Sequence, residues 1–274
     1  MSFLLPMALL TSVVIQPVAN LHSRPSGEAD VVSQAIYGTN VAWLDEAGGW
    51  VRVRTPDDYT GWVAAPALRR IERPYAVAGR VAEVEALFAN LYREPDVTRH
   101  QPLLTVPFEA RLEVVAEPET AERRWIQVRL ADDRAAWVQR GDVTFEPKRL
   151  SIEELIAFGR RFLGLPYLWG GTSTFGYDCS GFTQMLCRRR GISIPRDSGP
   201  QARWEGGVAV DKTQLQPGDL LFFGESPDRI THTGMYFGAG EFINATVHER
   251  PMVQISRLAE PYWTARLVAA RRVR

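Results

Sequence analysis

The residues best suited to chemistry are a cysteine and a histidine, because the chain has only two cysteines and four histidines. Cys179 lies in Asp178-Cys179-Ser180-Gly181, which follows a glycine-rich run and precedes an apolar-periodic stretch typical of a helix. A cysteine at a helix N-terminus sits at the positive end of the helix dipole, which favours thiolate over thiol. His232 follows about fifty residues downstream. The pattern indicates a nucleophilic cysteine with a histidine base.

The region that carries these two residues begins with helices and ends with strands. Ser151 and Glu154 form a capping-box pattern before an apolar helical face that ends at Gly164. A second helix is expected over 179–190. Short strand-like runs follow over 219–223, 231–237, 241–246, 253–257 and 266–271. Helices first and an antiparallel sheet second predict an α+β architecture.

A hairpin is expected to bring a third residue to the histidine. His232 and Asn244 flank a turn at Gly238-Ala239-Gly240. If this turn has three residues, Asn244 lies diagonally beside His232 on the same sheet face, whereas a two-residue loop would move it to the other face. In the first arrangement Cys179 attacks an amide carbonyl, His232 accepts and then donates the proton, and Asn244 fixes the ring.

Residues 12–146 contain an internal repeat. The segment 49–63 recurs as 124–138, and each copy carries two tryptophans around an Asp-Asp turn. Each copy alternates apolar and polar residues in short runs between Pro, Gly and Asp turns, which predicts strands and hairpins. We expect the tryptophans in the cores of the repeated units: Trp50, Trp62, Trp125 and Trp137. His22 and His100, also in this half, are expected at the surface.

The repeated units resemble bacterial SH3 domains through their Ala-Asn-Leu starts and Trp-containing hairpins. The second half resembles the NlpC family of papain-like cysteine peptidases, which cut peptidoglycan peptides. Five ordered motifs carry that resemblance: Tyr167-Leu168-Trp169-Gly170-Gly171, Asp178-Cys179-Ser180-Gly181-Phe182, Pro217-Gly218-Asp219-Leu220, His232-Thr233-Gly234-Met235-Tyr236 and Phe242-Ile243-Asn244-Ala245. It implies two SH3-like β-barrels, over 1–74 and 75–147, followed by an α+β papain-like catalytic domain over 148–274.

The resemblance also implies roles around the thiol. The oxyanion donors would be the backbone amide of Cys179 and the hydroxyl of Tyr167. The third catalytic residue of this family is often histidine, so Asn244 would make a Cys-His-Asn site. A neutral amide suffices to orient the ring of His232, and we expect activity to survive this difference. His248 is a rival candidate for the base.

Two SH3-like units ahead of an NlpC-type domain resemble the dipeptidyl-peptidase VI subgroup. Its members cleave the γ-D-glutamyl–diamino acid bond of murein tri- or tetrapeptides and require a free N-terminal L-alanine. An ammonium group buried at the end of a cleft needs a carboxylate partner. The residues that the resemblance places beside this amine are Asp178, Ser198, Tyr59 and Asp30, with Glu28 as the alternative to Asp30. Asp178 could instead simply cap the catalytic helix.

Composition limits the other classes of function. Lys+Arg and Asp+Glu are both 32, so no net charge favours nucleic acid or an anionic membrane. No stretch approaches the ~18 apolar residues of a membrane span. Cys179 and Cys187 lie about 12 Å apart on one helix, so both should be free thiols, with Cys187 in the core. No His/Cys cluster has ligand spacing, and we expect neither metal nor cofactor.

The location of the protein is predicted from its first residues and its thiols. Residues 1–10 are apolar but lack a basic start and are broken by Pro6, so we expect no cleaved signal peptide. With unpaired thiols, a cytoplasmic monomer that recycles murein peptides is the favoured reading. The alternative is an exported hydrolase, in the cell wall or periplasm, whose SH3-like units bind intact peptidoglycan. A catalytically inactive binding module is disfavoured because Cys179, His232 and Asn244 are all present.

Overall fold

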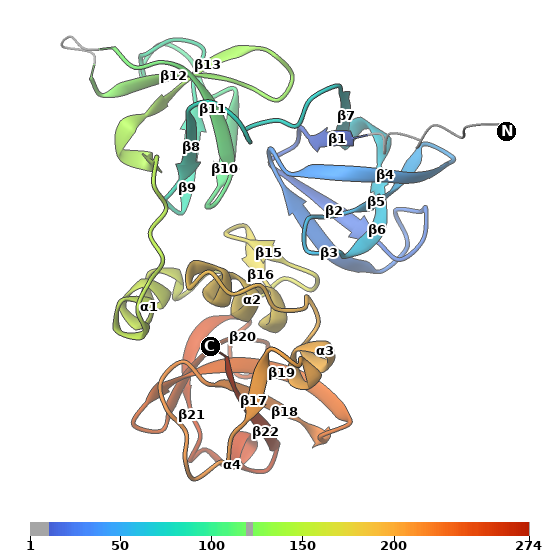
Figure 1. Ribbon diagram of the computed structural model, residues 1–274, viewed down its shortest axis with the longest axis vertical. Coiled ribbons are helices and arrows are strands. Elements are labelled where there is room, and N and C mark those ends of the chain that lie inside the picture. The colour runs from blue at the N-terminus through green and yellow to red at the C-terminus, as the bar shows by residue number, and fades with distance from the viewer. Residues whose placement is uncertain (1–10, 119–122, 274) are drawn as a thin grey trace, which may run out of the picture. The chain divides into compact units, whose positions relative to one another are not determined.

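The computed structural model describes residues 11–118 and 123–273. Its chain divides into two compact units, Met1–Pro147 and Lys148–Arg274. Figure 1 labels the strands of the first unit and the helices and strands of the second. Within the described residues, no helix combines the length and the apolar character needed to cross a bilayer.

The first unit opens with a seven-stranded sheet in the order β3-β2-β6-β5-β4-β1-β7. Alternate side chains of its strands, such as Val51 and Val53, fill one apolar core. Its elements are β1 (Thr11–Val14), β2 (Val18–His22), β3 (Val31–Ile36), β4 (Asn40–Ala47), β5 (Trp50–Arg54), β6 (Thr60–Ala64), a 3-10 turn (Ala65–Ala67) and β7 (Leu68–Ile71).

The rest of the first unit repeats this order with two sheets, β10-β9 and β13-β12-β11-β8-β14. The elements are β8 (Val81–Val84), β9 (Phe88–Leu91), β10 (Leu104–Pro107), β11 (Arg111–Ala116), β12 (Trp125–Arg129), β13 (Ala135–Gln139), a 3-10 turn (Arg140–Asp142) and β14 (Val143–Thr144). The repeat extends to register, since Trp50 pairs with Ala64 in one hairpin and Trp125 with Gln139 in the other. The second aspartate of each hairpin turn has a positive φ: 66° at Asp58 and 68° at Asp133.

An apolar cluster, separate from the core that holds Val51 and Val53, spans the two barrels. Buried residues of both lie in the same cluster, among them Val13 and Leu112. The hydroxyl of Tyr37 accepts a hydrogen bond from the backbone N–H of Ala131 at 2.7 Å, and the hydroxyl of Tyr75 donates to the carbonyl of Arg129 at 2.7 Å. The first unit is therefore one compact body rather than two independent domains.

Three of the four repeated tryptophans lie outside the cores, contrary to the sequence prediction. Val51 and Val53 point into the first core, so strand alternation turns the intervening face of β5 outward. Only Trp125 is buried, and the ring of Tyr92 packs edge-on against it at 5.5 Å. The partly exposed ones are Trp50, Trp62 and Trp137.

The prediction that His22 and His100 lie at the surface holds only for His100, whose side chain is half exposed. His22 is buried because the loop between β2 and β3 folds back over it. Its Nδ1 lies 2.9 Å from the carbonyl oxygen of Ala29, and its ring packs edge-on against Trp50 at 5.0 Å. These contacts anchor the loop that carries Glu28 and Asp30.

The second unit combines helices with a six-stranded antiparallel sheet in the order β17-β22-β18-β19-β20-β21, which confirms the α+β prediction (Figure 1). Helix α2 packs against β19 and β20. The elements are α1 (Ile152–Gly159), a 3-10 turn (Arg160–Phe162), β15 (Thr172–Ser173), β16 (Gly176–Tyr177), α2 (Cys179–Arg189), α3 (Ser198–Arg203), β17 (Gly207–Ala209), β18 (Leu220–Ser226), β19 (Arg229–Gly238), β20 (Glu241–Thr246), β21 (Met252–Arg257), α4 (Pro261–Thr264) and β22 (Leu267–Val273).

Local sequence signals explain how α1 and α2 begin. The capping box at α1 is present in both directions, from the N–H of Glu154 to the Ser151 hydroxyl and from the N–H of Ser151 to the Glu154 carboxylate. Helix α2 begins at Cys179, as the sequence predicts, with Asp178 as its N-cap. Short helix α3 and strand β17 are not part of the sequence prediction.

The hairpin between β19 and β20 differs from the sequence prediction but reaches the same register. Gly238 pairs with Glu241, so the loop holds two residues rather than three. A β-bulge just before Gly238 adds one residue to β19. The two changes cancel, and Asn244 stays on the sheet face that carries His232.

Candidate active site

The start of α2 is fixed by an unusually close approach of backbone to backbone. A Cβ atom on Gly181 would lie 2.2 Å from the carbonyl oxygen of Gly171, so only glycine fits there. The same Gly171 carbonyl accepts a hydrogen bond from the N–H of Asp178 at 3.1 Å. The glycine-rich loop therefore lies directly on the first turn of α2, where Cys179 is the first helical residue.

The thiol of Cys179 is buried beside β19. Backbone N–H groups of Thr233 and Ser180 donate towards it, and together with Arg196 they favour the thiolate. Burial opposes them, and with the negative charge of Asp178 it raises the pKa of the Cys179 thiol above its ordinary value. Burial therefore acts against the preference for thiolate that the helix start predicts.

His232 is held by Asn244 through one ring nitrogen. The Nε2 atom of His232 lies 2.9 Å from the side-chain oxygen of Asn244. The Asn244 amide group donates to the hydroxyl of Ser256 at 3.1 Å and to the carbonyl of Gln254 at 3.3 Å. These two donations settle which end of the amide faces the ring, so Nε2 carries the proton and Nδ1 is left as the acceptor.

Burial also sets the protonation state of His232. It lowers the pKa of the imidazole to about 4, although the Asn244 contact and the negative charge of Asp178 act in the opposite direction. Rings of Phe223 and Trp263 lie 5.6 and 5.1 Å from the His232 ring, centroid to centroid. A neutral imidazole in an apolar surrounding can accept a proton from a thiol as that thiol attacks a carbonyl.

His248, the rival base, has a different environment. Its ring stacks on Tyr262 with centroids 3.7 Å apart and planes 5° from parallel. It also meets Trp263 edge-on at 5.4 Å. Its charge contributes to lowering the pKa of His232, so it lies within electrostatic range of that residue. The hydrogen bond to Asn244 belongs to His232, and this favours His232 as the base.

Tyr167 lies within electrostatic range of the thiol. Burial and then the negative charges that Cys179 and Asp178 can carry raise the pKa of the Tyr167 hydroxyl, so the phenol is protonated and able to donate. Its backbone N–H donates to the carbonyl of Pro251 at 2.9 Å, which holds the loop after α1 against β21. The placement suits the predicted oxyanion donor.

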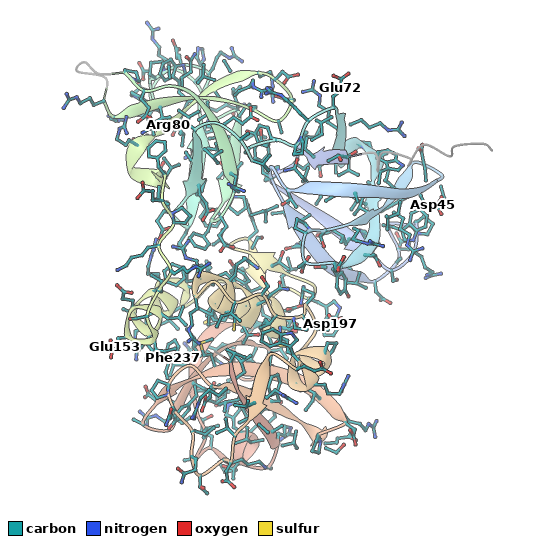
Figure 2. All side chains as sticks on the ribbon, in the orientation of Figure 1. Asp45, Glu72, Arg80, Glu153, Asp197 and Phe237 are labelled. Carbon is teal, nitrogen blue, oxygen red and sulfur yellow. The ribbon has the colours of Figure 1, made fainter. Side chains whose placement is uncertain are left out.

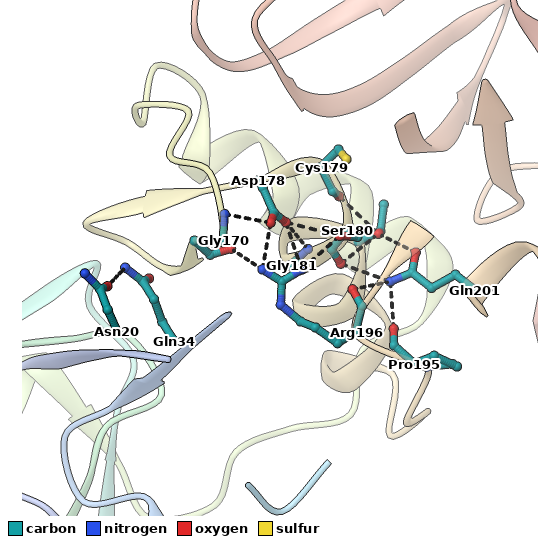
Figure 3. Close-up of polar contacts among 12 residues, drawn as sticks. Asn20, Gln34, Gly170, Asp178, Cys179, Ser180, Gly181, Pro195, Arg196 and Gln201 are labelled. Atoms are coloured by element: carbon teal, nitrogen blue, oxygen red, sulfur yellow. Dashed lines mark hydrogen bonds and ion pairs between the residues drawn. The ribbon is translucent and has the colours of Figure 1, made fainter. Parts of the chain in front are cut away.

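Asp178 is already surrounded by donors. One carboxylate oxygen accepts from the N–H of Gly181 at 2.7 Å and from the Ser180 hydroxyl at 3.2 Å. The other accepts from the N–H of Gly170 at 3.1 Å. Arg196 contacts both oxygens, at 3.0 and 2.7 Å (Figure 3). Asp178 therefore acts as a helix cap with an internal cationic partner.

The sequence prediction missed Arg196 and Gln201 at this site. Gln201, on α3, donates to the carbonyls of Ser180 at 3.0 Å and Pro195 at 2.9 Å and accepts from the Thr183 hydroxyl at 3.1 Å. These bonds attach α3 to the first turns of α2. The stretch Pro195-Arg196-Asp197-Ser198 contains the missed arginine, whereas the sequence prediction includes only Ser198.

The remaining predicted residues fall in both units. Ser198 is the first residue of α3, next to its N-cap Asp197 (Figure 2). Tyr59 is partly buried against the first core, immediately before β6. Glu28 and Asp30 are exposed in the β2–β3 loop. Cys179 and Cys187 are both free thiols, and Cys187 is fully buried, as predicted.

Metal binding finds no support in the part of the chain that the structure describes. No group of three or more His, Cys, Asp or Glu residues there could hold an ion. What the structure gathers is a buried thiol, a neutral imidazole with an amide partner, and a protonated phenol. That set can perform acyl transfer through a cysteine nucleophile.

Comparisons with known proteins agree with this chemistry. Residues 164–272 match the NlpC/P60 family, and residues 17–69 match the bacterial SH3 domain. A gamma-D-glutamyl-L-lysine dipeptidyl-peptidase of Bacillus cereus is 36% identical over 88% of this chain and 74% of its own. Dipeptidyl-peptidase 6 of Lysinibacillus sphaericus is 28% identical over 87% of this chain and 88% of its own.

A solved structure extends the likeness over nearly the whole chain. The crystal structure of an NlpC/P60 family protein from Bacillus cereus has a TM-score of 0.83 and 30% identity, and covers 96% of this chain and 99% of its own. The predicted resemblance to the NlpC family and to a bacterial SH3 domain is thereby confirmed. The chain belongs to the NlpC/P60 family and is a cysteine peptidase that carries a bacterial SH3 domain in its N-terminal unit.

Proposed function

We propose that this peptidase hydrolyses the γ-D-glutamyl–diamino acid bond of murein stem peptides and releases L-Ala-γ-D-Glu. The observation that carries the proposal is the contact between His232 and Asn244 on the sheet that packs against the Cys179 helix. The names of the relatives supply the bond type, since the Bacillus cereus relative is a gamma-D-glutamyl-L-lysine dipeptidyl-peptidase.

The reaction begins with a neutral pair. Sγ of Cys179 attacks the amide carbonyl, and its proton passes to Nδ1 of His232, because Nε2 is engaged by Asn244. The tetrahedral oxyanion receives hydrogen bonds from the Cys179 backbone amide and the Tyr167 hydroxyl. His232 then gives its proton to the departing amine, which leaves a thioester on Cys179. Water, deprotonated by His232, hydrolyses the thioester and restores the thiol.

We extend the proposal to stem peptides with a free N-terminal L-alanine. Its ammonium group needs a carboxylate partner once it leaves water. Asp178 is less suited than predicted, because Arg196 and three further donors already occupy its oxygens. Ser198 remains the candidate from the second unit, and the candidates from the first unit are Tyr59 and Asp30, with Glu28 as the alternative to Asp30.

The experiment is mass analysis of the products from L-Ala-γ-D-Glu-L-Lys and its diaminopimelate counterpart, with Cys179→Ala as the blank. The expected product is the dipeptide L-Ala-γ-D-Glu, absent from the blank. Release of any other fragment by the wild-type enzyme would contradict the bond assignment. The N-acetylated tripeptides test the amine separately, since equal cleavage of free and acetylated forms would exclude an ammonium pocket.

A role in recycling, in the cytoplasm, fits two free cysteines. The competing function is an exported hydrolase anchored to the wall, which the bacterial SH3 match favours. Sedimentation with intact sacculi separates the two. Binding of the Cys179→Ala protein to sacculi would support the anchored enzyme. A lack of binding would support the recycling enzyme.

A further inference from the structure

Arg196 is a buried cation beside the first turn of the nucleophile's helix. Its guanidinium side chain is 1% exposed. It donates to both carboxylate oxygens of Asp178, to the Ser180 hydroxyl at 2.9 Å and towards the Gly171 carbonyl at 3.5 Å (Figure 3). One side chain thus joins the glycine-rich loop, the helix cap and the first helical turn.

Capping alone does not explain this arginine. Asp178 caps α2 through Gly181, and aspartate or asparagine caps a helix without any cationic partner. Removing a guanidinium from water has a large desolvation penalty, and buried ion pairs often add little net stability. A buried pair at this position therefore points to a requirement of the site rather than of the fold.

The position of Cys179 supplies that requirement. Asp178 is adjacent to the nucleophile, and its negative charge disfavours the thiolate, whereas the charge of Arg196 favours it. Asp197, next to Arg196 in the chain, also acts on the Arg196 charge. Further groups that interact with this region include Tyr167, whose hydroxyl interacts with both Cys179 and Asp178, and His232, which interacts with Asp178. The charge of Arg196 opposes that of Asp178 at the thiol, so the loss of Arg196 would leave the Asp178 charge acting on Cys179 without this opposition.

We propose that Arg196 is a positioning residue for Cys179: it ties the glycine-rich loop to the first turn of α2 and neutralises Asp178 beside the thiol. This deepens the proposed function, since it rests on Cys179 as the nucleophile. The backbone of Arg196 is itself held, because Gln201 donates towards its carbonyl at 3.5 Å and to that of Pro195 at 2.9 Å. Arg196 is thus held through its side chain at the start of α2 and through its backbone by α3.

The test is the pH dependence of the alkylation rate of Cys179 by iodoacetamide in the full chain, with Cys179→Ala subtracting any reaction at Cys187. Arg196→Met should raise the pH midpoint by roughly one unit or more, because a neighbouring cation is lost. Asp178→Asn should lower it, and the double variant should return it close to the wild-type value. Arg196→Lys keeps the positive charge, so the pH midpoint of alkylation should stay at the wild-type value. Lysine cannot reproduce the contacts of the guanidinium, so kcat on the tripeptide should fall by a larger factor than KM changes.

A second ion pair in the same unit provides the matched control. Arg272 contacts both oxygens of the buried Asp219 at 2.8 Å, between β22 and the start of β18. Arg272→Met should lower the unfolding temperature without moving the alkylation midpoint. A wild-type midpoint in Arg196→Met, with destabilisation like that of Arg272→Met, would make Arg196 merely structural.

Alkylation needs no peptide substrate, so its outcome is independent of the proposed bond specificity. Failure of the wild-type enzyme to cleave the tripeptide, with the predicted midpoint shifts present, would overturn only the proposed substrate. If Arg196→Met does not fold, Asp178→Asn and Arg196→Lys still decide the matter. An Asp178→Asn midpoint equal to or above the wild-type value would contradict the inference.

Discussion

The two compact units differ in whether they bury charged side chains. In the part of the first unit that the structure describes, no Asp, Glu, Lys or Arg is buried, and the ion pair between Arg69 and Asp133 lies at the surface. The second unit buries charged groups in its interior. They are Asp178, Arg189, Arg196 and Asp219.

This difference separates stability from chemistry. Surface ion pairs contribute little to folding, whereas a buried charge persists only with a specific partner and a fixed geometry. The charges of Asp178 and Arg196 both act on the thiol, and the neutral pair Asn244–His232 lies on the sheet that packs against α2. Apart from its proposed amine-binding residues, the first unit should accordingly respond to substitution through stability, and the second through activity.

The two cysteines give the largest expected contrast. Cys179→Ala should reduce tripeptide hydrolysis by roughly 10⁴-fold or more, because the nucleophile is removed. Cys187→Ala, in the same helix, should retain kcat and lose only a little stability, since it shortens a fully buried side chain. Product release followed by mass spectrometry measures both. Comparable losses in the two variants would remove Cys179 from its proposed role.

Asn244 should have the next largest effect. Asn244→Ala leaves Nε2 of His232 without its oriented partner, and we expect kcat to fall about 10²- to 10³-fold. Asn244→His, which places the residue type common in this family at the position, should restore part of the loss. Steady-state kinetics on the tripeptide measure both, with Ser256→Ala as a milder variant that loosens only the Asn244 amide. A change in KM alone would contradict the orienting role.

The sequence predicts the contact between Asn244 and His232 from a three-residue turn, but the turn in the structure has two residues. Alternation along β20 fixes which residues share a face, but it does not say where an extra residue is inserted. The bulge before Gly238 compensates for a loop that is one residue shorter than predicted. The contact was predictable because a buried face constrains the register more strongly than a turn does.

Other features lay beyond the sequence for different reasons. In β5, Trp50 and Val51 are both apolar, so alternation alone does not say which one faces the core. Arg196 follows no apolar pattern, and its partner Asp178 is 18 residues away. From sequence alone, a charged residue is predicted to be solvent-exposed, because the partner that makes its burial possible is visible only in the structure.

The buried imidazole should make the second unit sensitive to acid. The folded-state pKa of His232 is about 4 against an ordinary 6.5, so between these values the unfolded chain binds more protons. The free energy of unfolding should therefore fall as the pH drops from 6.5 to 4, by on the order of 3 kcal/mol from this group. Urea unfolding of the wild type and His232→Gln across this range measures it. Equal pH slopes in the two proteins would contradict the assignment.

In the first unit, two tyrosines at the junction of the barrels should give smaller effects, confined to stability. Tyr37→Phe leaves the buried N–H of Ala131 without its acceptor, which should reduce stability by about 1–3 kcal/mol. Tyr75→Phe removes a donor from the Arg129 carbonyl, and the loss should be smaller, because an under-satisfied carbonyl is tolerated better than an orphaned N–H. Thermal unfolding measures which of the two variants loses more stability. In both variants kcat on the tripeptide should stay at the wild-type value. The reverse order, or a fall in kcat at constant stability, would show that the first unit's polar groups do more than hold its two barrels together.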